Sequence, residues 1–340
     1  MNRVSAVTLP TAPLGRTGTE ITRVGLGTWA LGGPGWAFNW GPQDDEDSVR
    51  AIRRAVELGI GWIDTAPAYG IGHSEEVVAR ALREVPEGDR PLVFTKCGRV
   101  FRAGERTPHT DLSAASIRRE CEDSLRRLGV ERLDLYQVHW PVLDLATVEE
   151  GWATMASLAG EGKARWIGVA NFAVEHLEVC ERIRHVDTLQ PPLSLVQRSM
   201  LDEVIPWCRA HGTGVIVYSP LQSGLLTGRF TRERVEALAP GDWRRRSEQF
   251  TEPRLPRNLE LVELLRPIAA RLGCSLAELA IAWAVAQPGV TGAIVGARGP
   301  KHVDGWIGAP GLALGAEDLA EIAAAVARSG AGTDPPRPPS

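Results

Sequence analysis

Residues 92–96 read LVFTK, residues 113–129 read SAASIRRECEDSLRRLG, and residues 134–139 read DLYQVH. The first and third runs are short and rich in β-branched and aromatic residues, which is typical of strands. In the middle run apolar residues recur at intervals of three and four, and Gly129 ends the pattern, which predicts an amphipathic helix. A strand, a helix and a strand in this order indicate a βαβ unit with parallel strands.

The same alternation continues along most of the chain. Eight strands are expected, at Val24-Ala30, Gly61-Thr65, Leu92-Lys96, Asp134-His139, Arg165-Ala170, Ser194-Gln197, Val215-Ser219 and Gly292-Gly296. Helices are expected between them, at Asp45-Leu58, Ser74-Glu84, Ser113-Leu128, Thr147-Ala159, Val174-Ile183, Asp202-His211 and Asn258-Leu272. Eight such units predict an α/β fold with a closed (β/α)8 TIM barrel. An open doubly wound sheet is the competing architecture, but no GxGxxG turn leads from the first strand into a helix.

The length of 340 residues fits two domains or one large barrel with long loops. A composition of 44% hydrophobic and 24% charged residues is that of a globular protein, which excludes a mainly disordered, collagen-like or coiled-coil chain. Thirty-eight basic and 42 acidic residues give a net charge of −4 without a long block of one sign, so a nucleic-acid-binding surface is not expected.

Localisation and metal content follow from what the sequence lacks. The apolar run from Leu276 to Val295 is interrupted by Glu278 and Gln287-Pro288, and no other run is long enough to span a bilayer. The first residues lack the apolar core of a secretory signal. Five widely spaced cysteines fit neither a disulfide framework nor a zinc motif. We therefore expect a soluble, cytoplasmic protein with no membrane partner and no bound metal.

The domain boundaries are placed by composition. Residues 1–12 are expected to be a flexible N-terminus, and residues 13–329 a single barrel domain. Residues 13–21 predict a β-hairpin that plugs one end of the barrel. Residues 229–257 contain several prolines and an arginine run, which predicts a lid loop. The Pro-rich tail, residues 330–340, is expected to be disordered.

Polar residues stand at the predicted carboxyl ends of the strands, where (β/α)8 enzymes build their active sites. Asp64, Lys96 and His139 lie at strand ends, and Tyr69 follows the second strand. Singly, each could be structural, but jointly they favour catalysis. A lysine cation would lower the pKa of Tyr69 from about 10 toward neutral pH. Asp64 would keep Lys96 charged, and His139 would donate a hydrogen bond to the substrate oxygen.

Four motifs resemble the aldo-keto reductase family. They are GWIDTAPAYG at residues 61–70, VFTK at residues 93–96, DLYQVHWP at residues 134–141 and GVANF at residues 168–172. The resemblance extends from about residue 14 to residue 309 and includes the family's branch of channel-associated subunits. It implies a catalytic tetrad of Asp64, Tyr69, Lys96 and His139, in which Tyr69 donates the proton. It also implies a nicotinamide cofactor bound in extended form without a Rossmann domain.

The resemblance implies cofactor contacts position by position. Asn171 and Gln197 match residues that bind the nicotinamide carboxamide, and Tyr218 matches the aromatic residue on which the ring stacks. Arg229 and Arg298 match sites for the adenosine 2′-phosphate, since arginine suits phosphate. The candidate cofactor-binding residues are Thr28, Trp29, Asp64, Asn171, Gln197, Tyr218, Ser219, Pro220, Leu221, Ser223, Gly224, Leu225, Arg229, Gly296, Arg298 and His302.

Two departures from the family pattern affect the cofactor site. The residues that contact adenine are replaced by His302, Gly305 and Trp306, and Trp306 could either stack on the base or pack its helix. Ala170 replaces a serine, which removes one hydroxyl contact. The two arginines favour NADPH, and NAD remains an alternative.

The first predicted βα loop holds Trp29, Trp36, Phe38 and Trp40. Part of this cluster is expected to form the apolar wall of a substrate pocket, with Trp29 nearest the nicotinamide, and at least one ring to pack within the loop.

Three functional hypotheses follow from these residues. The leading one is an NADPH-dependent reductase that converts an aldehyde or ketone to an alcohol, with a small-molecule carbonyl compound as its partner. In a second, Lys96 is the Schiff-base nucleophile of an aldolase-like enzyme, although Asp64 should hold that lysine charged. In a third, the protein is a regulatory subunit that binds the cofactor without turnover. The sequence names neither the substrate nor the oligomeric state.

Overall fold

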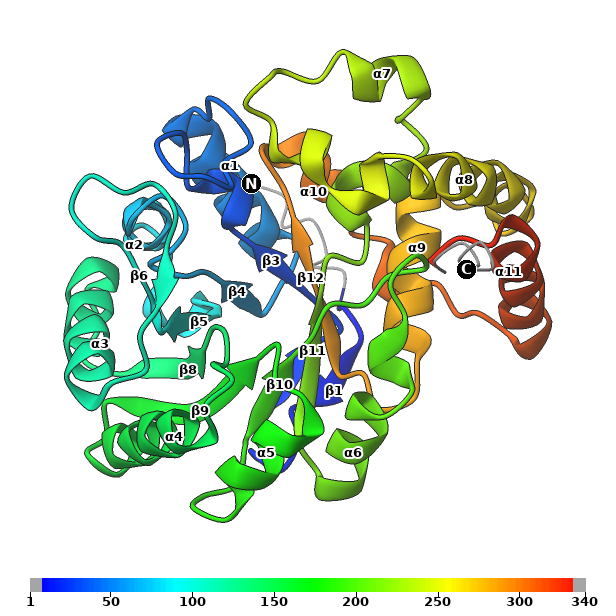
Figure 1. The fold of residues 1–340 in the computed structure, drawn as a ribbon. Helices are drawn as coiled ribbons and strands as arrows, with labels where there is room; N and C mark the ends of the chain where they lie inside the picture. The colour runs from blue at the N-terminus through cyan, green and yellow to red at the C-terminus, as the bar shows by residue number, and fades with distance from the viewer. Residues whose placement is uncertain (1–7, 333–340) are drawn as a thin grey trace, which may run out of the picture.

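The computed structural model describes residues 8–332 and contains a closed barrel of eight parallel strands (Figure 1). Around the barrel the strands are β3 (Val24–Gly27), β4 (Trp62–Asp64), β5 (Leu92–Cys97), β8 (Leu133–Val138), β9 (Ala164–Ala170), β10 (Thr188–Gln190), β11 (Gly214–Tyr218) and β12 (Gly292–Gly296). Strand β12 pairs with β3 and closes the ring. The predicted (β/α)8 barrel is confirmed.

Successive side chains of a strand point to opposite faces, so every second residue points into the barrel. These inward residues form two layers, one above the other. The lower layer is apolar and consists of Trp62, Phe94, Leu135, Trp166, Ile216 and Ile294. Two residues further along the same strands, the inward positions include Asp64 on β4, Lys96 on β5 and Gln137 on β8. The strand period of two therefore places a ring of polar side chains directly above an apolar floor.

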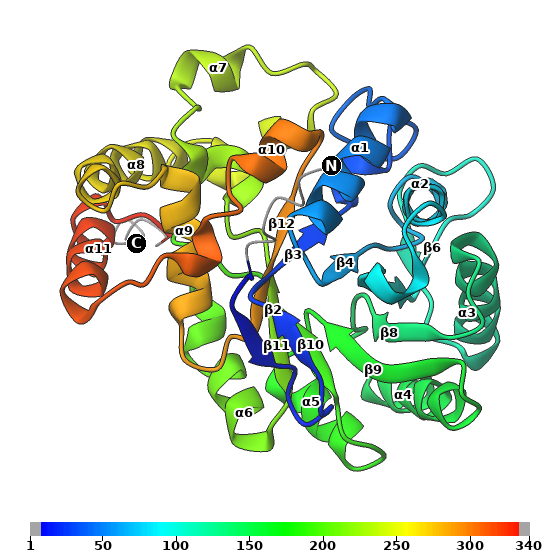
Figure 2. The ribbon, with the colours of Figure 1, turned by 180° about the vertical axis from the view of Figure 1, so that it is seen from behind.

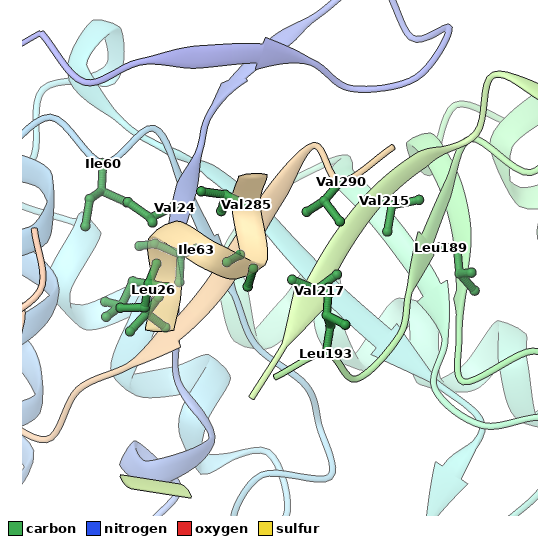
Figure 3. Close-up of a cluster of buried hydrophobic side chains, with 14 of the residues drawn as sticks. Val24, Leu26, Ile60, Ile63, Leu189, Leu193, Val215, Val217, Val285 and Val290 are labelled. Atoms are coloured by element: carbon green, nitrogen blue, oxygen red, sulfur yellow. The ribbon is translucent and has the colours of Figure 1, made fainter. Parts of the chain in front are cut away.

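The outward strand residues form the main core with the surrounding helices. Figure 3 shows Val24, Leu26 and Ile63 of the strands in one cluster with Val285. The helices are α1 (Asp45–Glu57), α2 (His73–Leu82), α3 (Ala114–Leu128), α4 (Leu145–Gly160), α5 (Val174–Glu181), α6 (Val204–His211), α8 (Arg254–Arg271), α9 (Leu276–Ala286), α10 (Pro300–Asp304) and α11 (Ala316–Ser329). Each of the seven expected helices is present, with ends shifted by a few residues.

A hairpin closes the barrel at its amino end, as predicted (Figure 2). Strands β1 (Thr11–Pro13) and β2 (Glu20–Thr22) pair antiparallel, and the buried side chains of Leu14 and Ile21 join the apolar floor. The expected flexible N-terminus of residues 1–12 is therefore too long, because Thr11 and Ala12 are paired in β1. Residues 1–7 lie outside the described part of the chain.

The sixth strand is displaced from its expected position. Strand β10 is Thr188–Gln190, whereas Ser194 and Gln197 form a tight turn with two reciprocal backbone hydrogen bonds. The apolar run Leu193–Val196 is buried outside the barrel sheet, so its hydrophobicity reflects packing against other elements. The prediction of a strand at Ser194-Gln197 is wrong.

The expected lid is a folded segment rather than an open loop. Between Arg229 and Arg257 it contains α7 (Arg232–Glu236), two short 3-10 turns and the start of α8. Phe230, Val235, Phe250 and Leu255 form a small apolar core with Leu225. This segment arches over one side of the barrel mouth in Figure 1.

The chain end is also more ordered than expected over three residues. Gly330 to Gly332 follow α11, Ala331 is fully buried, and its carbonyl accepts a hydrogen bond from Arg198. The assignment of residues 330–332 to a disordered tail is therefore wrong, and residues 333–340 lie outside the described part. No single helix in residues 8–332 is both long and apolar enough to cross a membrane.

Candidate active site

Asp64 and Lys96 form a buried ion pair at the carboxyl ends of β4 and β5. Lys96 Nζ lies 2.5 Å from Asp64 Oδ1, and both side chains are at most 3% exposed. Nζ also donates to the backbone carbonyl of Thr65 at 2.9 Å and to Tyr69 Oη at 3.3 Å. An ammonium has three N–H donors, and all three are used. The contact with Asp64 favours the charged lysine, and the engagement of all three donors disfavours its use as a Schiff-base nucleophile, although burial acts against the charge.

Tyr69 is held over this pair by the turn that follows β4. Its amide donates to the carbonyl of Ala66, and its carbonyl accepts from Ser74 at the start of α2. The next residue, Gly70, has a φ of 70°, and a Cβ there would lie 1.9 Å from the carbonyl oxygen of Gly32. Only glycine fits this close approach between two loops, so the turn that orients the phenol depends on it.

Burial controls the acidity of Tyr69. The side chain is 8% exposed, and burial raises its pKa well above the usual value near 10, with the carboxylate of Asp64 acting in the same direction. The expectation that Lys96 would bring this pKa down toward neutral is therefore wrong. Burial also lowers the pKa of Lys96, although Asp64 opposes that change. Tyr69 is consequently a protonated phenol at neutral pH.

His139 follows β8 and faces the same space. Its ring centroid lies 5.7 Å from that of Tyr69, edge to face. Burial, together with Lys96 and Arg99, lowers the pKa of His139 well below 6.5, so the imidazole is neutral at pH 7. Its Nδ1 is buried without a hydrogen-bond partner in the described residues. A buried polar atom without a partner is costly unless a ligand satisfies it.

Two buried glutamines, which the sequence reading missed, complete the polar ring. Gln190 Nε2 donates to Asp64 Oδ2 at 2.8 Å and lies 3.3 Å from Gln137 Oε1, while Gln137 Nε2 lies 3.4 Å from Asp64 Oδ2. Gln137 lies within the motif DLYQVHWP, two residues before His139, and the period of two from Leu135 could have revealed it. Gln190 was missed because the sixth strand was misplaced.

Of the two residues predicted to bind the nicotinamide carboxamide, Asn171 lies at the barrel mouth and Gln197 does not. Asn171 lies at the end of β9, with a φ of 65°, and accepts a hydrogen bond from Tyr218 Oη at 2.8 Å. Its backbone N–H donates to the carbonyl of Gln190, and its side-chain Nδ2 donates to the carbonyl of His139 at 3.0 Å. Gln197 is instead in the turn after β10, half-buried and outside the ring. The strand-end amide next to Asn171 is therefore Gln190.

The loop after β11 has an unusual backbone. Ser219, Gln222, Ser223 and Gly224 have positive φ angles of 59°, 43°, 55° and 92°. Such conformations bring successive backbone N–H groups toward one side and create a concave site for an anion. Pro220 and Leu225 of this loop are buried and anchor it. The predicted cofactor residues of this loop therefore lie in a segment suited to a pyrophosphate.

The residues expected to contact the adenosine are only partly available. The Arg298 guanidinium donates to Gln43 Oε1 and to the carbonyls of Trp40 and Pro42, so it fastens the first βα loop. Arg229, His302 and Gly296 are exposed. Trp306 is 3% exposed and packs in the main core, which decides between the two roles left open for it.

An aromatic cluster covers the phenol. Trp29 is stacked on Tyr69 with the centroids 6.0 Å apart, and Trp243 of the lid segment is stacked on Trp29 at 5.9 Å. Trp36 is buried against the same rings and serves as the loop's own core. The neighbouring Thr28 is fully buried, and its hydroxyl donates to the carbonyl of Asp64, which is a structural role.

The comparisons with known proteins agree with this geometry. The chain matches the model of the aldo/keto reductase family over residues 23–327 and belongs to that family. It is 38% identical to aldo-keto reductase YhdN of Bacillus subtilis over 90% of both chains. It is 36% identical to the NADH-specific methylglyoxal reductase of Escherichia coli over 93% of this chain and 99% of that one.

Solved structures support the same assignment. The glycerol dehydrogenase AKR11B4 from Gluconobacter oxydans matches with a TM-score of 0.86 and 35% identity, over 99% of this chain and all of that one. Aldo-keto reductase AKR11C1 from Bacillus halodurans matches with a TM-score of 0.77 and 26% identity, over 93% and 96% of the two chains. The protein is therefore an oxidoreductase that acts on small carbonyl compounds.

Proposed function

We propose that this protein reduces an aldehyde or ketone to an alcohol with NADPH, and that Tyr69 is the general acid. The observation that carries the proposal is the placement of a protonated phenol 3.3 Å from Lys96 Nζ and edge to face with a neutral His139. These groups surround one space at the barrel mouth, where a carbonyl oxygen would meet both a proton donor and a hydrogen-bond donor.

Each residue of the site has a distinct task. A dihydronicotinamide, when bound, would supply a hydride for the carbonyl carbon. Tyr69 Oη transfers its proton to the carbonyl oxygen, and Lys96 stabilises the phenolate that develops as the proton leaves. Asp64 holds Lys96 in place through Oδ1, while Gln190 and Gln137 donate hydrogen bonds to its second carboxylate oxygen, Oδ2. His139 orients the substrate oxygen through a hydrogen bond.

The described residues fit a nicotinamide dinucleotide. Asn171 and Gln190 offer amides for the carboxamide, Tyr218 offers a ring face, and the loop at residues 219–225 offers backbone N–H groups for the pyrophosphate. The exposed Arg229 supports the preference for NADPH, whereas the Arg298 guanidinium is engaged by the first βα loop, and NADH is the alternative. We retain a cytoplasmic location and a free small-molecule substrate as parts of the proposal.

The pH dependence follows from the directions of the two pKa shifts. Reduction needs Tyr69 protonated and His139 neutral. Because the pKa of Tyr69 is raised and that of His139 is lowered, kcat for reduction is expected to stay flat from about pH 6.5 to about pH 9. Alcohol oxidation needs the Tyr69 phenolate, so its kcat is expected to rise roughly tenfold per pH unit over this range. A fall in reduction above neutral pH would show instead that Tyr69 has a lowered pKa.

The corrected position of the strand-end glutamine is testable with a matched pair of variants. Gln190→Leu removes the donor to Asp64 and the proposed carboxamide contact, and is expected to lower kcat/KM for the carbonyl roughly tenfold or more. Gln197→Leu changes a glutamine of the neighbouring turn and is expected to leave the Kd of the cofactor within about twofold. Steady-state kinetics and cofactor titration of both variants distinguish them. Equal losses of cofactor affinity in the two variants would contradict the assignment.

The proposed function itself is tested by binding and turnover together. Tryptophan fluorescence titrated with NADPH and NADH measures both affinities, because Trp29 and Trp243 lie beside the site. Oxidation of each cofactor is then followed with 4-nitrobenzaldehyde. We expect turnover, and tighter binding of NADPH than of NADH. Tight cofactor binding without reduction of any compound in a broad carbonyl panel would contradict the proposal and favour a regulatory subunit.

A further inference from the structure

A cavity of about 850 Å³ opens beside the aromatic cluster and is not used by the tetrad. Most of its lining comes from the first βα loop, the turn after β10 and the lid segment at residues 243–254, and single residues come from three other segments, namely Thr107, Gln222 and Gly332. Phe38 and Trp243 form an apolar part of its wall. Its size suits a small organic molecule rather than water alone.

A stack of aromatic rings connects the cavity wall to Tyr69. Trp243 lines the cavity and stacks on Trp29, which in turn stacks on Tyr69. The indole nitrogen of Trp29 also donates to the backbone carbonyl of Phe38 at 2.9 Å. The cavity therefore lies next to the catalytic site on the far side of the Trp29 and Trp243 rings, and Trp243 is the residue that the two spaces share as a neighbour.

Another part of the cavity wall is formed by positively charged side chains. Arg198, Arg246 and Arg254 line the cavity together with a single acidic residue, Glu248. Glu248 pairs with Arg254 at 2.9 Å. Arg198 donates instead to the backbone carbonyls of Leu195 and Ala331.

Two of the three arginines therefore keep their charge available. In residues 8–332 no carboxylate lies within ion-pair distance of Arg198 or Arg246 in the structure. Neutral carbonyl acceptors satisfy hydrogen bonds but do not cancel a charge, and Asp202 acts on Arg198 only from beyond ion-pair distance, so the charged groups on this side of the cavity are mainly positive.

We propose that the substrate is an anionic carbonyl compound, whose carboxylate or phosphate binds Arg198 and Arg246 while its carbon chain lies along Phe38 and Trp243. This inference rests on the proposed reductase function and adds the substrate class. Guanidinium groups bind both anions through paired N–H donors, and the partly enclosed cavity screens that attraction less than bulk water does. Arg246 and Arg198 determine specificity and take no part in hydride or proton transfer.

The test compares each charged substrate with an uncharged partner. The first set is ω-oxo acids of increasing chain length and their methyl esters, and the second is glyceraldehyde 3-phosphate and glyceraldehyde. We expect kcat/KM for at least one anionic member to exceed that of its neutral partner tenfold or more. The advantage is expected to shrink as salt is raised. The two sets distinguish a carboxylate preference from a phosphate preference.

A matched pair of lid variants isolates the cavity charge. Arg246→Gln is expected to lower kcat/KM for the anionic compound about tenfold, mainly through KM, and to leave the neutral partner unchanged. Arg245→Gln is the control, since Arg245 belongs to the same arginine run, does not line the cavity and donates to the carbonyl of Leu238. Arg198→Lys retains the charge and is expected to lower kcat/KM less than Arg246→Gln.

Three results would overturn the inference. One is equal kcat/KM for charged and neutral partners in the unmodified protein. Another is an Arg246→Gln effect of equal size on both. The third is an increase in the Kd of NADPH in Arg246→Gln, which would assign this arginine to the cofactor. If no carbonyl compound is reduced, the proposed function fails, and fluorescence titration with the ω-oxo acid in the two lid variants still decides whether the cavity binds anions.

Discussion

Tyr69→Phe is expected to lower kcat for carbonyl reduction by about 100-fold to 10,000-fold, the range that a positioned general acid contributes. The substitution removes only the hydroxyl, so the ring contacts with Trp29 and His139 are retained. The Kd of the cofactor is therefore expected to change by less than about twofold. Single-turnover reduction of 4-nitrobenzaldehyde, with fluorescence titration of the cofactor, measures both quantities.

A second tyrosine provides the control. Tyr136 is fully buried on β8 but points outward, and its hydroxyl donates to the carbonyl of Ile117 at 3.3 Å. Tyr136→Phe is expected to retain full activity while losing about 1 kcal/mol of stability. Full activity in Tyr69→Phe would eliminate this phenol as the acid, whatever the behaviour of the control.

Asp64→Asn is expected to reduce the free energy of unfolding by about 3–5 kcal/mol, because it leaves the Lys96 ammonium buried without a counter-charge. Reductase activity is expected to fall at the same time, since Lys96 is no longer held beside Tyr69. Urea unfolding followed by circular dichroism measures the loss of stability, and steady-state kinetics measures the loss of activity.

The double variant separates stability from catalysis. Asp64→Asn combined with Lys96→Met removes both charges and is expected to recover most of the lost stability while remaining inactive. A stable and active double variant would show that the ion pair is not needed for proton transfer. A single variant as stable as the unmodified protein would show that the pair is solvated rather than buried.

Local pattern was sufficient for the barrel and for selecting Asp64, Tyr69, Lys96 and His139 as residues that meet at its mouth. Strands and helices alternate with clear periods, and Asp64, Lys96 and His139 come at strand ends, which a parallel barrel brings to one face. The sixth strand escaped prediction because Thr188–Gln190 is short and is followed by Pro191 and Pro192, whereas the longer apolar run after it resembles a strand. With that strand misplaced, Gln190 could not be recognised.

Residue types and their order were therefore enough to establish which chemistry gathers at the barrel mouth, because strand period and chain direction are local properties. The acidity of Tyr69, the engagement of Arg298 by the first loop and the positive wall at Arg198 and Arg246 were decided only in three dimensions. They depend on burial and on neighbours that are distant in the chain, and both arise only when the barrel closes and the lid segment packs on it.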